Sequence, residues 1–132
     1  MRGARAVQES IIKKYSKADI SISLVWITML PEDSKEKARV EAGNFSDPRL
    51  LHFYDPNKRS GAAIADSLGY EDRVAWDIYL FYTAGAAWIE KPPAPTAWMH
   101  QLSETWIDRK HYHSGDDLVR ELSVAMEKFI VP

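Results

Sequence analysis

The stretch that decides the fold runs from Val74 to His100. It opens with VAWDIYLFY, continues through a Thr83-Ala84-Gly85 link into AAWIE, and then reaches the proline run KPPAP. The first segment is almost wholly aromatic and aliphatic, as in a strand covered on both faces. The glycine of the link accepts the positive φ of a tight hairpin, and the prolines cannot donate to a ladder. The stretch therefore predicts a central strand over Val74–Tyr82, a turn, and a short antiparallel edge strand over Ala86–Glu90.

Length and composition bound the class of protein. The chain has 132 residues, of which 45% are hydrophobic and 27% are charged, values typical of one soluble globular domain. We therefore expect a single domain over residues 1–132. The net charge of -2 gives no general attraction to nucleic acid or anionic lipid, and no apolar run approaches the ~20 residues of a membrane span. We expect a cytoplasmic protein that binds neither nucleic acid nor membrane.

Two residue types occur in unusual numbers. The chain has no cysteine, which excludes disulfides, thiolate nucleophiles and cysteine-ligated metal centres in this polypeptide. It has five tryptophans, four of which lie in the second half. Aromatic side chains bury much apolar area, so the main interpretation is a tryptophan-rich core. The alternative is an aromatic-walled site for a small molecule, with Trp98, His100 and Trp106 as its ligand-binding residues.

The other elements follow from periodicity and capping signals. The sequence predicts a helix around Val7–Tyr15, a strand over Ile20–Met29, a helix over Lys35–Ala42, a strand over Leu50–Tyr54 and a helix from Asp55-Pro56 to Gly69. Thr96–Tyr112 has no sustained period and is interpreted as a long ordered loop. A terminal helix then starts near Ser114, which forms a capping-box pattern with Asp117. Its apolar face comprises Leu118, Leu122, Ala125, Met126 and Phe129.

This order of elements, together with several short motifs, resembles the thioredoxin-like fold. The segments VWITMLPEDS, DPR, YDP, WDIY, PPAP, WMHQ and HYH are similar to parts of bacterial thioredoxin-like proteins of unassigned role. The resemblance covers the chain from Ile20 onward. It implies an α/β fold, a three-layer sandwich with a mixed sheet in which Ile20–Met29 and Val74–Tyr82 are adjacent central strands.

The chain departs from the thioredoxin pattern at the redox site. In thioredoxin-like proteins a strand leads into a Cys-x-x-Cys motif at the start of the first long helix. Here that helix starts near Gly3, so both features would lie upstream of Met1. The cis-proline that precedes the hairpin in the family is replaced by Arg73-Val74-Ala75. The resemblance therefore implies a redox-inactive protein whose sheet lacks its first strand.

One group of residues has metal-ligand character. It contains His100, His111 and His113 with Asp116 and its neighbour Asp117. Histidines two apart on an extended segment share one side and can chelate one ion. Three imidazole nitrogens and a carboxylate suit zinc. The alternative is that these histidines bind loop backbone and cap the last helix, and no cofactor is predicted.

Two further patterns were weighed. A hydrolase would combine one of these histidines with a serine and an acid, from the candidates Ser103, Ser114, Asp108 and Asp116, although no nucleophile-elbow motif is present. The exposed cluster Lys13, Lys14 and Lys17 is typical of a solvated helix face rather than of a phosphate site.

Asp77 interrupts the apolar strand pattern. A buried carboxylate without partners is costly, so Asp77 should face solvent, pair with Arg73 or Arg49, or accept from backbone donors. The favoured interpretation is a structural ion pair rather than catalysis.

The leading hypothesis is a small α/β domain of thioredoxin-like type that acts by binding. Its partner is expected to be a second copy, because a sheet that lacks a strand exposes an edge that invites pairing. The interface of this homodimer is expected to include the N-terminal helix or the adjacent sheet edge. The alternative is a metal-binding protein or metal-dependent enzyme that uses His111 and His113. An unidentified small molecule or protein partner fits either hypothesis.

Overall fold

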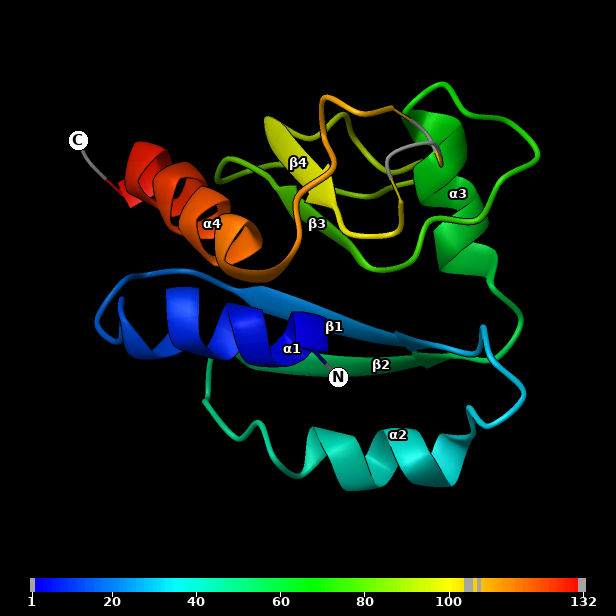
Figure 1. Cartoon of the computed structure of the whole chain (residues 1–132), viewed down its shortest axis with the longest axis horizontal. Helices are drawn as coiled ribbons and strands as arrows, with labels where there is room; N and C mark the ends of the chain where they lie inside the picture. The colour runs from blue at the N-terminus through cyan, green and yellow to red at the C-terminus, as the bar shows by residue number, and fades with distance from the viewer. Residues whose placement is uncertain (1, 104–105, 107, 131–132) are drawn as a thin grey trace. The chain divides into compact units, whose positions relative to one another are not determined.

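The computed structural model describes residues 2–103, 106 and 108–130 and confirms the α/β class (Figure 1). The chain divides into two compact units, residues 1–59 and 60–132, and each is described by itself. No helix in the described ranges is long and apolar enough to cross a membrane. The elements are α1 (Arg2–Val7), the π-helical η1 (Gln8–Lys13), β1 (Ile22–Ile27), α2 (Lys35–Ala42), β2 (Leu50–Asp55), α3 (Arg59–Ser67), β3 (Ile78–Phe81), β4 (Ala97–His100) and α4 (Gly115–Ile130).

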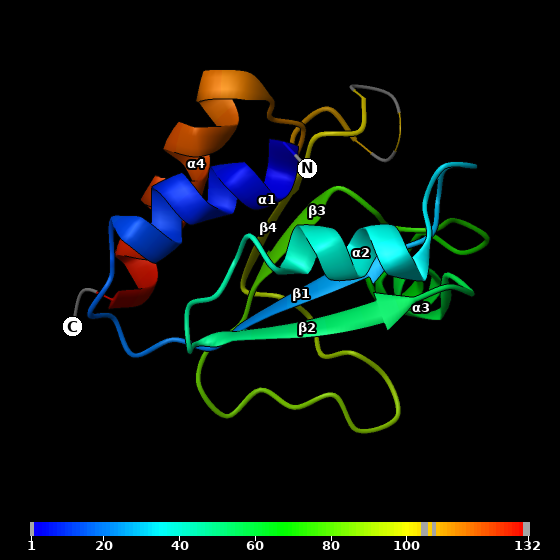
Figure 2. The same ribbon diagram turned by 90° about the horizontal axis from the view of Figure 1, so that it is seen from below.

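The first unit is built on a parallel pair of strands. β1 and β2 run in register from Ile22 opposite Leu50 to Ile27 opposite Asp55, and α2 is the crossover between them. α2 lies along one face of this sheet (Figure 2). The serine before α2, Ser34, accepts a hydrogen bond from the Lys37 N–H at 3.1 Å and fixes the start of the helix. The predicted bounds of α2 are confirmed. Both predicted strands form, but β1 is two residues shorter at each end than the predicted Ile20–Met29, and β2 ends one residue later than predicted, at Asp55.

An arginine fastens the end of the N-terminal helix to the sheet. All five guanidinium N–H donors of Arg49 are used, two of them on the Asp47 carboxylate at 2.9 and 3.0 Å. The other three reach carbonyl oxygens at and beyond the helix end. These are the oxygens of Ile12 at 3.0 Å, Tyr15 at 2.8 Å and Ala18 at 3.1 Å. The hydrogen bond from Arg49 also lowers the pKa of Asp47.

α3 opens the second unit and starts later than the sequence predicts. The predicted cap Asp55 does accept a hydrogen bond at the helix start, but from the Arg59 N–H, at 3.1 Å. Lys58 takes a positive φ of 60°, so the helix begins at Arg59 rather than at Pro56. Its predicted end is confirmed, because Gly69 has a φ of 89°, which a residue without Cβ adopts at little cost.

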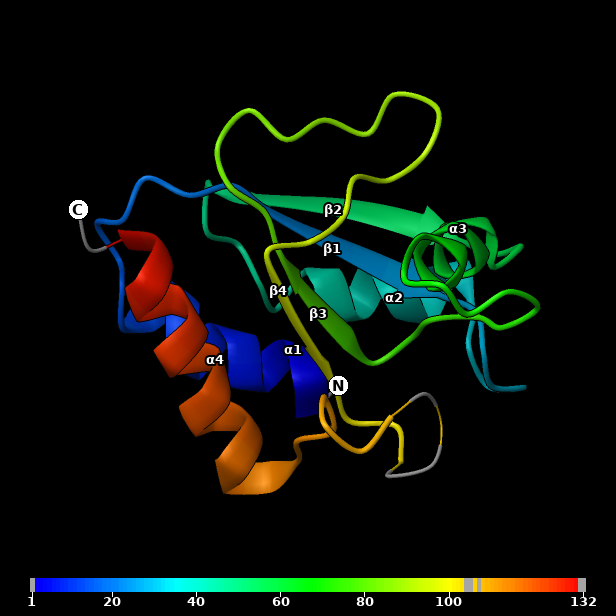
Figure 3. The same ribbon diagram turned by 90° about the horizontal axis from the view of Figure 1, so that it is seen from above.

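The predicted partner of the central strand is wrong. β3 pairs antiparallel with Ala97–His100, not with Ala86–Glu90. The turn at Thr83–Gly85 does form, since the Ala86 N–H donates to the Thr83 carbonyl at 3.2 Å. Residues 86–91 beyond it are exposed and belong to a wide loop instead of a strand (Figure 3). The ladder with β3 starts only at Thr96, directly after the last proline. The prolines therefore precede a strand, where a missing N–H donor costs nothing, instead of ending one.

This pairing also corrects the long loop predicted over Thr96–Tyr112. Its first part is β4, and residues 104, 105 and 107 lie outside the described ranges. The strand Ala97-Trp98-Met99-His100 is hard to recognise from its sequence, because its residues do not alternate between apolar and polar. Two of them, Met99 and His100, are buried.

The central strand itself is shorter than Val74–Tyr82. Asp77 has a φ of 49°, a left-handed conformation that breaks an extended chain before β3 begins. Upstream of it, the Ala75 N–H donates to the Gly61 carbonyl of α3 at 2.9 Å instead of to a strand. The prediction that Asp77 lies in a buried strand is wrong, because Asp77 is exposed and β3 begins only at Ile78. Arg73, a predicted ion-pair partner, donates to the Trp106 carbonyl at 2.9 Å, and Arg49 is occupied as described above.

The described strands form two separate two-stranded sheets, β1–β2 and β3–β4. The expected pairing of Ile20–Met29 beside Val74–Tyr82 in one mixed sheet is therefore not found. In the second unit, α3 forms a core cluster with the segment before β3, through Ile64, Ala65 and Ala75. The predicted apolar face of α4 is confirmed, with Leu118, Leu122, Ala125 and Met126 buried and Phe129 against Phe81.

We predict that Arg49→Lys lowers the melting temperature by roughly 5–10 °C, because one ammonium cannot replace the five guanidinium bonds that join the helix end to Asp47 and the start of β2. Thermal unfolding followed by circular dichroism measures this. The control Arg39→Lys alters an exposed arginine whose partner Glu36 is 3.7 Å away, and should change the melting temperature by only about 1 °C. Equal effects of the two variants would contradict the role assigned to Arg49.

Candidate functional site

The residues singled out by the sequence gather around β4 and the segment that follows it. β4 is joined to residues 111–113 by a parallel bridge between His100 and Tyr112. The His100 N–H donates to the His111 carbonyl, and the His100 carbonyl accepts from the His113 N–H, both at 2.9 Å. This pair of bonds fixes the backbone between the two flanking histidines.

His100 is fully buried, and both of its ring nitrogens are used. Nδ1 accepts a hydrogen bond from the Leu102 N–H at 3.4 Å, so the proton is on Nε2, which donates to the Asp108 carbonyl at 3.1 Å. A metal ion could reach His100 only by displacing one of these bonds. Its geometry is that of a satisfied core histidine.

The predicted ligand-binding residues Trp98, His100 and Trp106 are brought together. The ring of His100 lies 6.2 Å from that of Trp98 and 5.3 Å from that of Trp106, centroid to centroid. Trp106 also packs against the core cluster of α3. His100 thus contacts both tryptophan rings. The prediction of a tryptophan-rich core is wrong, because none of the five tryptophans is a buried core residue and Trp88 is 49% exposed.

His111 forms an oriented pair with Asp108. Its Nδ1 lies 2.7 Å from Asp108 Oδ2, and its ring stacks on Trp98 with centroids 3.8 Å apart and planes 11° apart. Asp108 also accepts from the His111 N–H at 2.8 Å and from the Tyr70 hydroxyl at 3.3 Å. Burial alone would raise the pKa of Asp108, but the hydrogen bonds from His111 and Tyr70 outweigh it, so the pKa is lowered.

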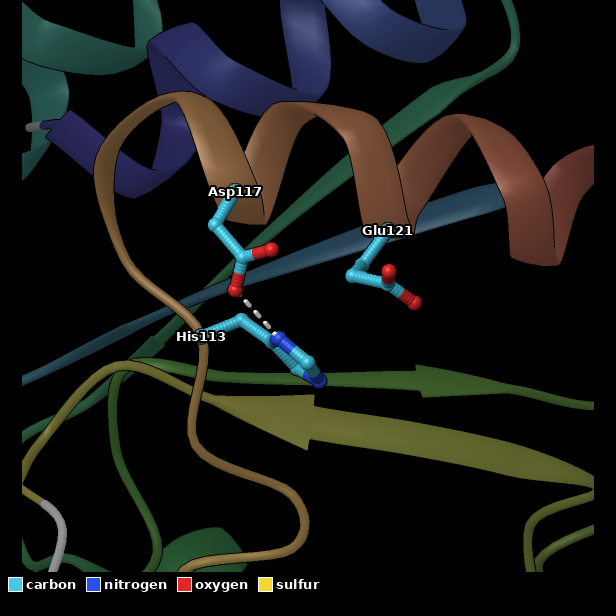
Figure 4. Close-up of side chains that lie close together, drawn as sticks. All are labelled: His113, Asp117 and Glu121. Atoms are coloured by element: carbon cyan, nitrogen blue, oxygen red, sulfur yellow. Dashed lines mark hydrogen bonds and ion pairs between the residues drawn. The ribbon is translucent and has the colours of Figure 1, made fainter.

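A second histidine–carboxylate group lies at the start of α4 (Figure 4). It consists of His113, Asp117 and Glu121, each of which offers one ligand atom, and these atoms all lie within 4.8 Å of one another. Asp117 and Glu121 are four residues apart on α4 and therefore share one side of the helix. His113 reaches that side from the segment held by His100. We call these three residues the His113 group.

Hydrogen bonds already orient the His113 group. His113 Nδ1 lies 2.6 Å from Asp117 Oδ2, and the Arg120 guanidinium contacts the other Asp117 oxygen. The hydrogen bond with His113 is the main reason that the pKa of Asp117 is lowered, and Arg120 adds to it. The side chains of His113 and Asp117 are 24% and 42% exposed, so the group is open to solvent on one side.

The structure separates the predicted metal ligands. Of His100, His111, His113 and Asp116, only His113 belongs to the His113 group, whereas His111 turns to Asp108 and Asp116 is exposed. Asp117 was considered as an acid near the histidines, but Glu121 was missed. The pattern His113-x-x-x-Asp117-x-x-x-Glu121 was readable in the sequence as one helical stripe.

The other candidates carry less chemistry. Ser114, one of the serines weighed for a hydrolase, accepts from the Tyr112 hydroxyl at 3.4 Å. The lysines of the basic cluster are exposed, as predicted. In the first unit a hollow of about 450 Å³ is lined by Arg5, Gln8, Glu9, Asn44 and Phe45.

Comparisons with family models, with curated proteins and with solved structures found no match. The site therefore has to be judged from its own geometry.

We predict that Asp108→Asn lowers the free energy of unfolding by about 1 kcal/mol at neutral pH, because an amide replaces the carboxylate that accepts from His111 and Tyr70. Because the pKa of Asp108 is lowered in the folded state, the stabilisation from its carboxylate is fully present when the pH is above the ordinary pKa of an aspartate. This stabilisation is lost as the pH falls through the pKa of the folded state. The difference between wild type and variant should therefore shrink below about pH 4. Urea unfolding at several pH values measures it, with the exposed Asp116→Asn as control. A difference that does not change with pH would contradict the assignment.

Proposed function

We propose that this domain binds a divalent transition-metal ion through the His113 group. The observation that carries the proposal is the convergence of one nitrogen and two carboxylate ligands within 4.8 Å of one another. Zinc bonds to such atoms at about 2.0–2.2 Å, which places neighbouring ligands about 3–4 Å apart. Small rotations of the Asp117 and Glu121 side chains would shorten the distances between the ligand atoms from 4.8 Å or less to this range.

The donor set favours one class of metal ion. Calcium and magnesium prefer shells made entirely of oxygen, whereas an imidazole with two carboxylates suits zinc and its first-row neighbours. Three protein ligands leave a coordination position for water, as in sites that are not purely structural.

Metal binding has to compete with the existing contacts of Asp117. A cation replaces the hydrogen bond from His113 and draws Asp117 away from Arg120, and the imidazole must be unprotonated to ligate. The lowered pKa of Asp117 keeps this carboxylate ionised under the same conditions.

We predict that zinc at a hundred times its dissociation constant stabilises the chain by about 2.7 kcal/mol through mass action. Thermal unfolding and calorimetric titration of the metal-free chain measure this. His113→Ala and the isosteric Glu121→Gln should abolish the zinc-dependent shift, because each removes one ligand.

Matched controls use residues of the same types outside the His113 group. His111→Ala and Asp116→Asn should keep the zinc-dependent shift, whatever their effect on stability without metal. Loss of the shift in His111→Ala with retention in Glu121→Gln would favour the ligand set read from the sequence. No shift with micromolar zinc, or a shift that survives His113→Ala, would refute metal binding here.

A second candidate function is self-association, favoured by one observation in the first unit. One face of the β1–β2 sheet carries the apolar residues Val25, Leu51 and Phe53. Their exposed fractions are 45%, 54% and 50%. Contiguous apolar surface of this kind commonly marks an interaction site. We therefore keep the homodimer as the proposed partner state, alongside metal binding.

The thioredoxin-like resemblance and a cytoplasmic location stay proposals as well. The order of a parallel pair joined by a helix, an antiparallel pair and a last helix supports the resemblance. The absence of cysteine supports a role other than thiol–disulfide exchange.

A further inference from the structure

We propose that the hollow in the first unit binds a small zwitterion, an α-amino acid with a neutral polar side chain. Its volume of about 450 Å³ lies within the roughly 300–1,000 Å³ of small-molecule sites. All of its lining residues belong to the first unit, so the hollow is a feature of that unit by itself. These residues are Arg5, Gln8, Glu9, Asn44 and Phe45. The site shares no residue with the His113 group and goes beyond the proposed metal binding.

The helical side of the hollow is formed where the helix changes its winding. α1 passes directly into the π-helical η1, and the first two residues of η1, Gln8 and Glu9, line the hollow. Single π-helical turns within helices are frequent at functional sites. At this junction the Ser10 hydroxyl, which is buried, donates to the Ala6 carbonyl at 2.6 Å. The wide turn is therefore held by an internal hydrogen bond and presents its polar residues to the hollow.

The other side of the hollow is held in place by the sheet. Phe45 follows α2 and is only 3% exposed. Its ring lies 6.3 Å from that of Trp26, centroid to centroid, and its carbonyl contacts His52 Nε2 at 3.0 Å. Its N–H also donates to the Ala42 carbonyl at 3.0 Å. This side of the hollow is therefore fixed before a ligand arrives, which lowers the cost of binding.

The two charged residues of the hollow do not neutralise each other. Arg5 and Glu9 lie four residues apart, a spacing at which opposite charges on a helix commonly pair. Glu9 instead contacts Lys13, whose Nζ lies 2.8 Å from Glu9 Oε1. Among the described residues of the first unit, no acidic side chain pairs with Arg5. The hollow thus offers a guanidinium to a carboxylate and the second Glu9 oxygen to an ammonium group, the two charges of one zwitterion.

Two amides determine the preference for the side chain of the ligand. Gln8 and Asn44 each offer a carbonyl acceptor and an NH₂ donor. Asn44 Nδ2 lies 3.5 Å from the Glu41 carboxylate, which is long for a hydrogen bond, so this amide is weakly held. A neutral polar group such as another primary amide can donate to and accept from both side chains. Glutamine therefore carries each of the groups that the hollow recognises.

Calorimetric titration with L-glutamine tests the proposal, in the presence of a chelator so that the His113 group takes no part. We expect saturable binding. Glutamine α-amide lacks the carboxylate and N-acetylglutamine lacks the ammonium group. Each should bind at least about tenfold more weakly, because each loses one charged partner.

Substitutions assign each charge of the ligand to one residue. Arg5→Gln and Glu9→Gln should each weaken glutamine binding at least about tenfold. Arg5→Gln should also abolish the discrimination against the α-amide, and Glu9→Gln that against the N-acetyl derivative. The matched controls Arg39→Gln and Glu36→Gln remove the same charges from α2, outside the hollow, and should leave binding unchanged.

Lys13→Gln separates a role in ligand binding from a role in the ion pair. It breaks the contact between Lys13 and Glu9 but changes no lining residue, so it should not weaken binding. A loss equal to that in Glu9→Gln would overturn the role of Glu9 in binding. The site itself is refuted by the absence of saturable binding at millimolar glutamine, or by binding that Arg5→Gln and Glu9→Gln leave unchanged. Equal affinities for glutamine and its two derivatives would overturn the zwitterion as the ligand class.

Discussion

A buried imidazole holds the candidate site together. His100 has no exposed surface, yet both its ring nitrogens and both its backbone groups have partners. A buried polar group without partners is costly, so the chain around His100 has little freedom. Its backbone bonds fix His111 and His113, and its ring bonds fix Asp108 and Leu102. The arrangement on either side of Tyr112 therefore depends on this histidine, which is itself no candidate ligand.

This constraint explains why the two neighbouring histidines do different things. Spacing by two on an extended segment predicts imidazoles on one side, where they could chelate together. Held by His100, the segment instead presents His111 to Trp98 and Asp108, and His113 to the first turn of α4. Each histidine thus acquires its own carboxylate. A carboxylate that contacts a histidine also orients its ring.

Local signals were readable from the sequence, and non-local pairing was not. The bounds of α2, the glycine that ends α3 and the apolar stripe of α4 each depend on a few neighbouring residues, and all three were predicted correctly. The pairing of β3 with β4 spans a long connection. The turn at Thr83–Gly85 instead suggested a hairpin with Ala86–Glu90, which does not form. Nothing in the sequence announces the left-handed Asp77 that shortens β3. Glu121 lies on α4, four residues beyond Asp117 and outside the loop that contains the histidines, so the histidine pattern does not point to it.

The stability of the first unit depends on contacts beyond its two-stranded sheet. An isolated pair of strands is marginal in water, and further strands or a packed helix are needed. Arg49 meets part of this need by tying the helix end to the start of β2, and Trp26 packs near Phe45 and His52 on the face of α2. Neither contact involves the outer edge of β1 or the strip that carries Val25 and Phe53. The first unit therefore depends for its stability on the helices that pack on its sheet and on the bonds that Arg49 makes to the helix end.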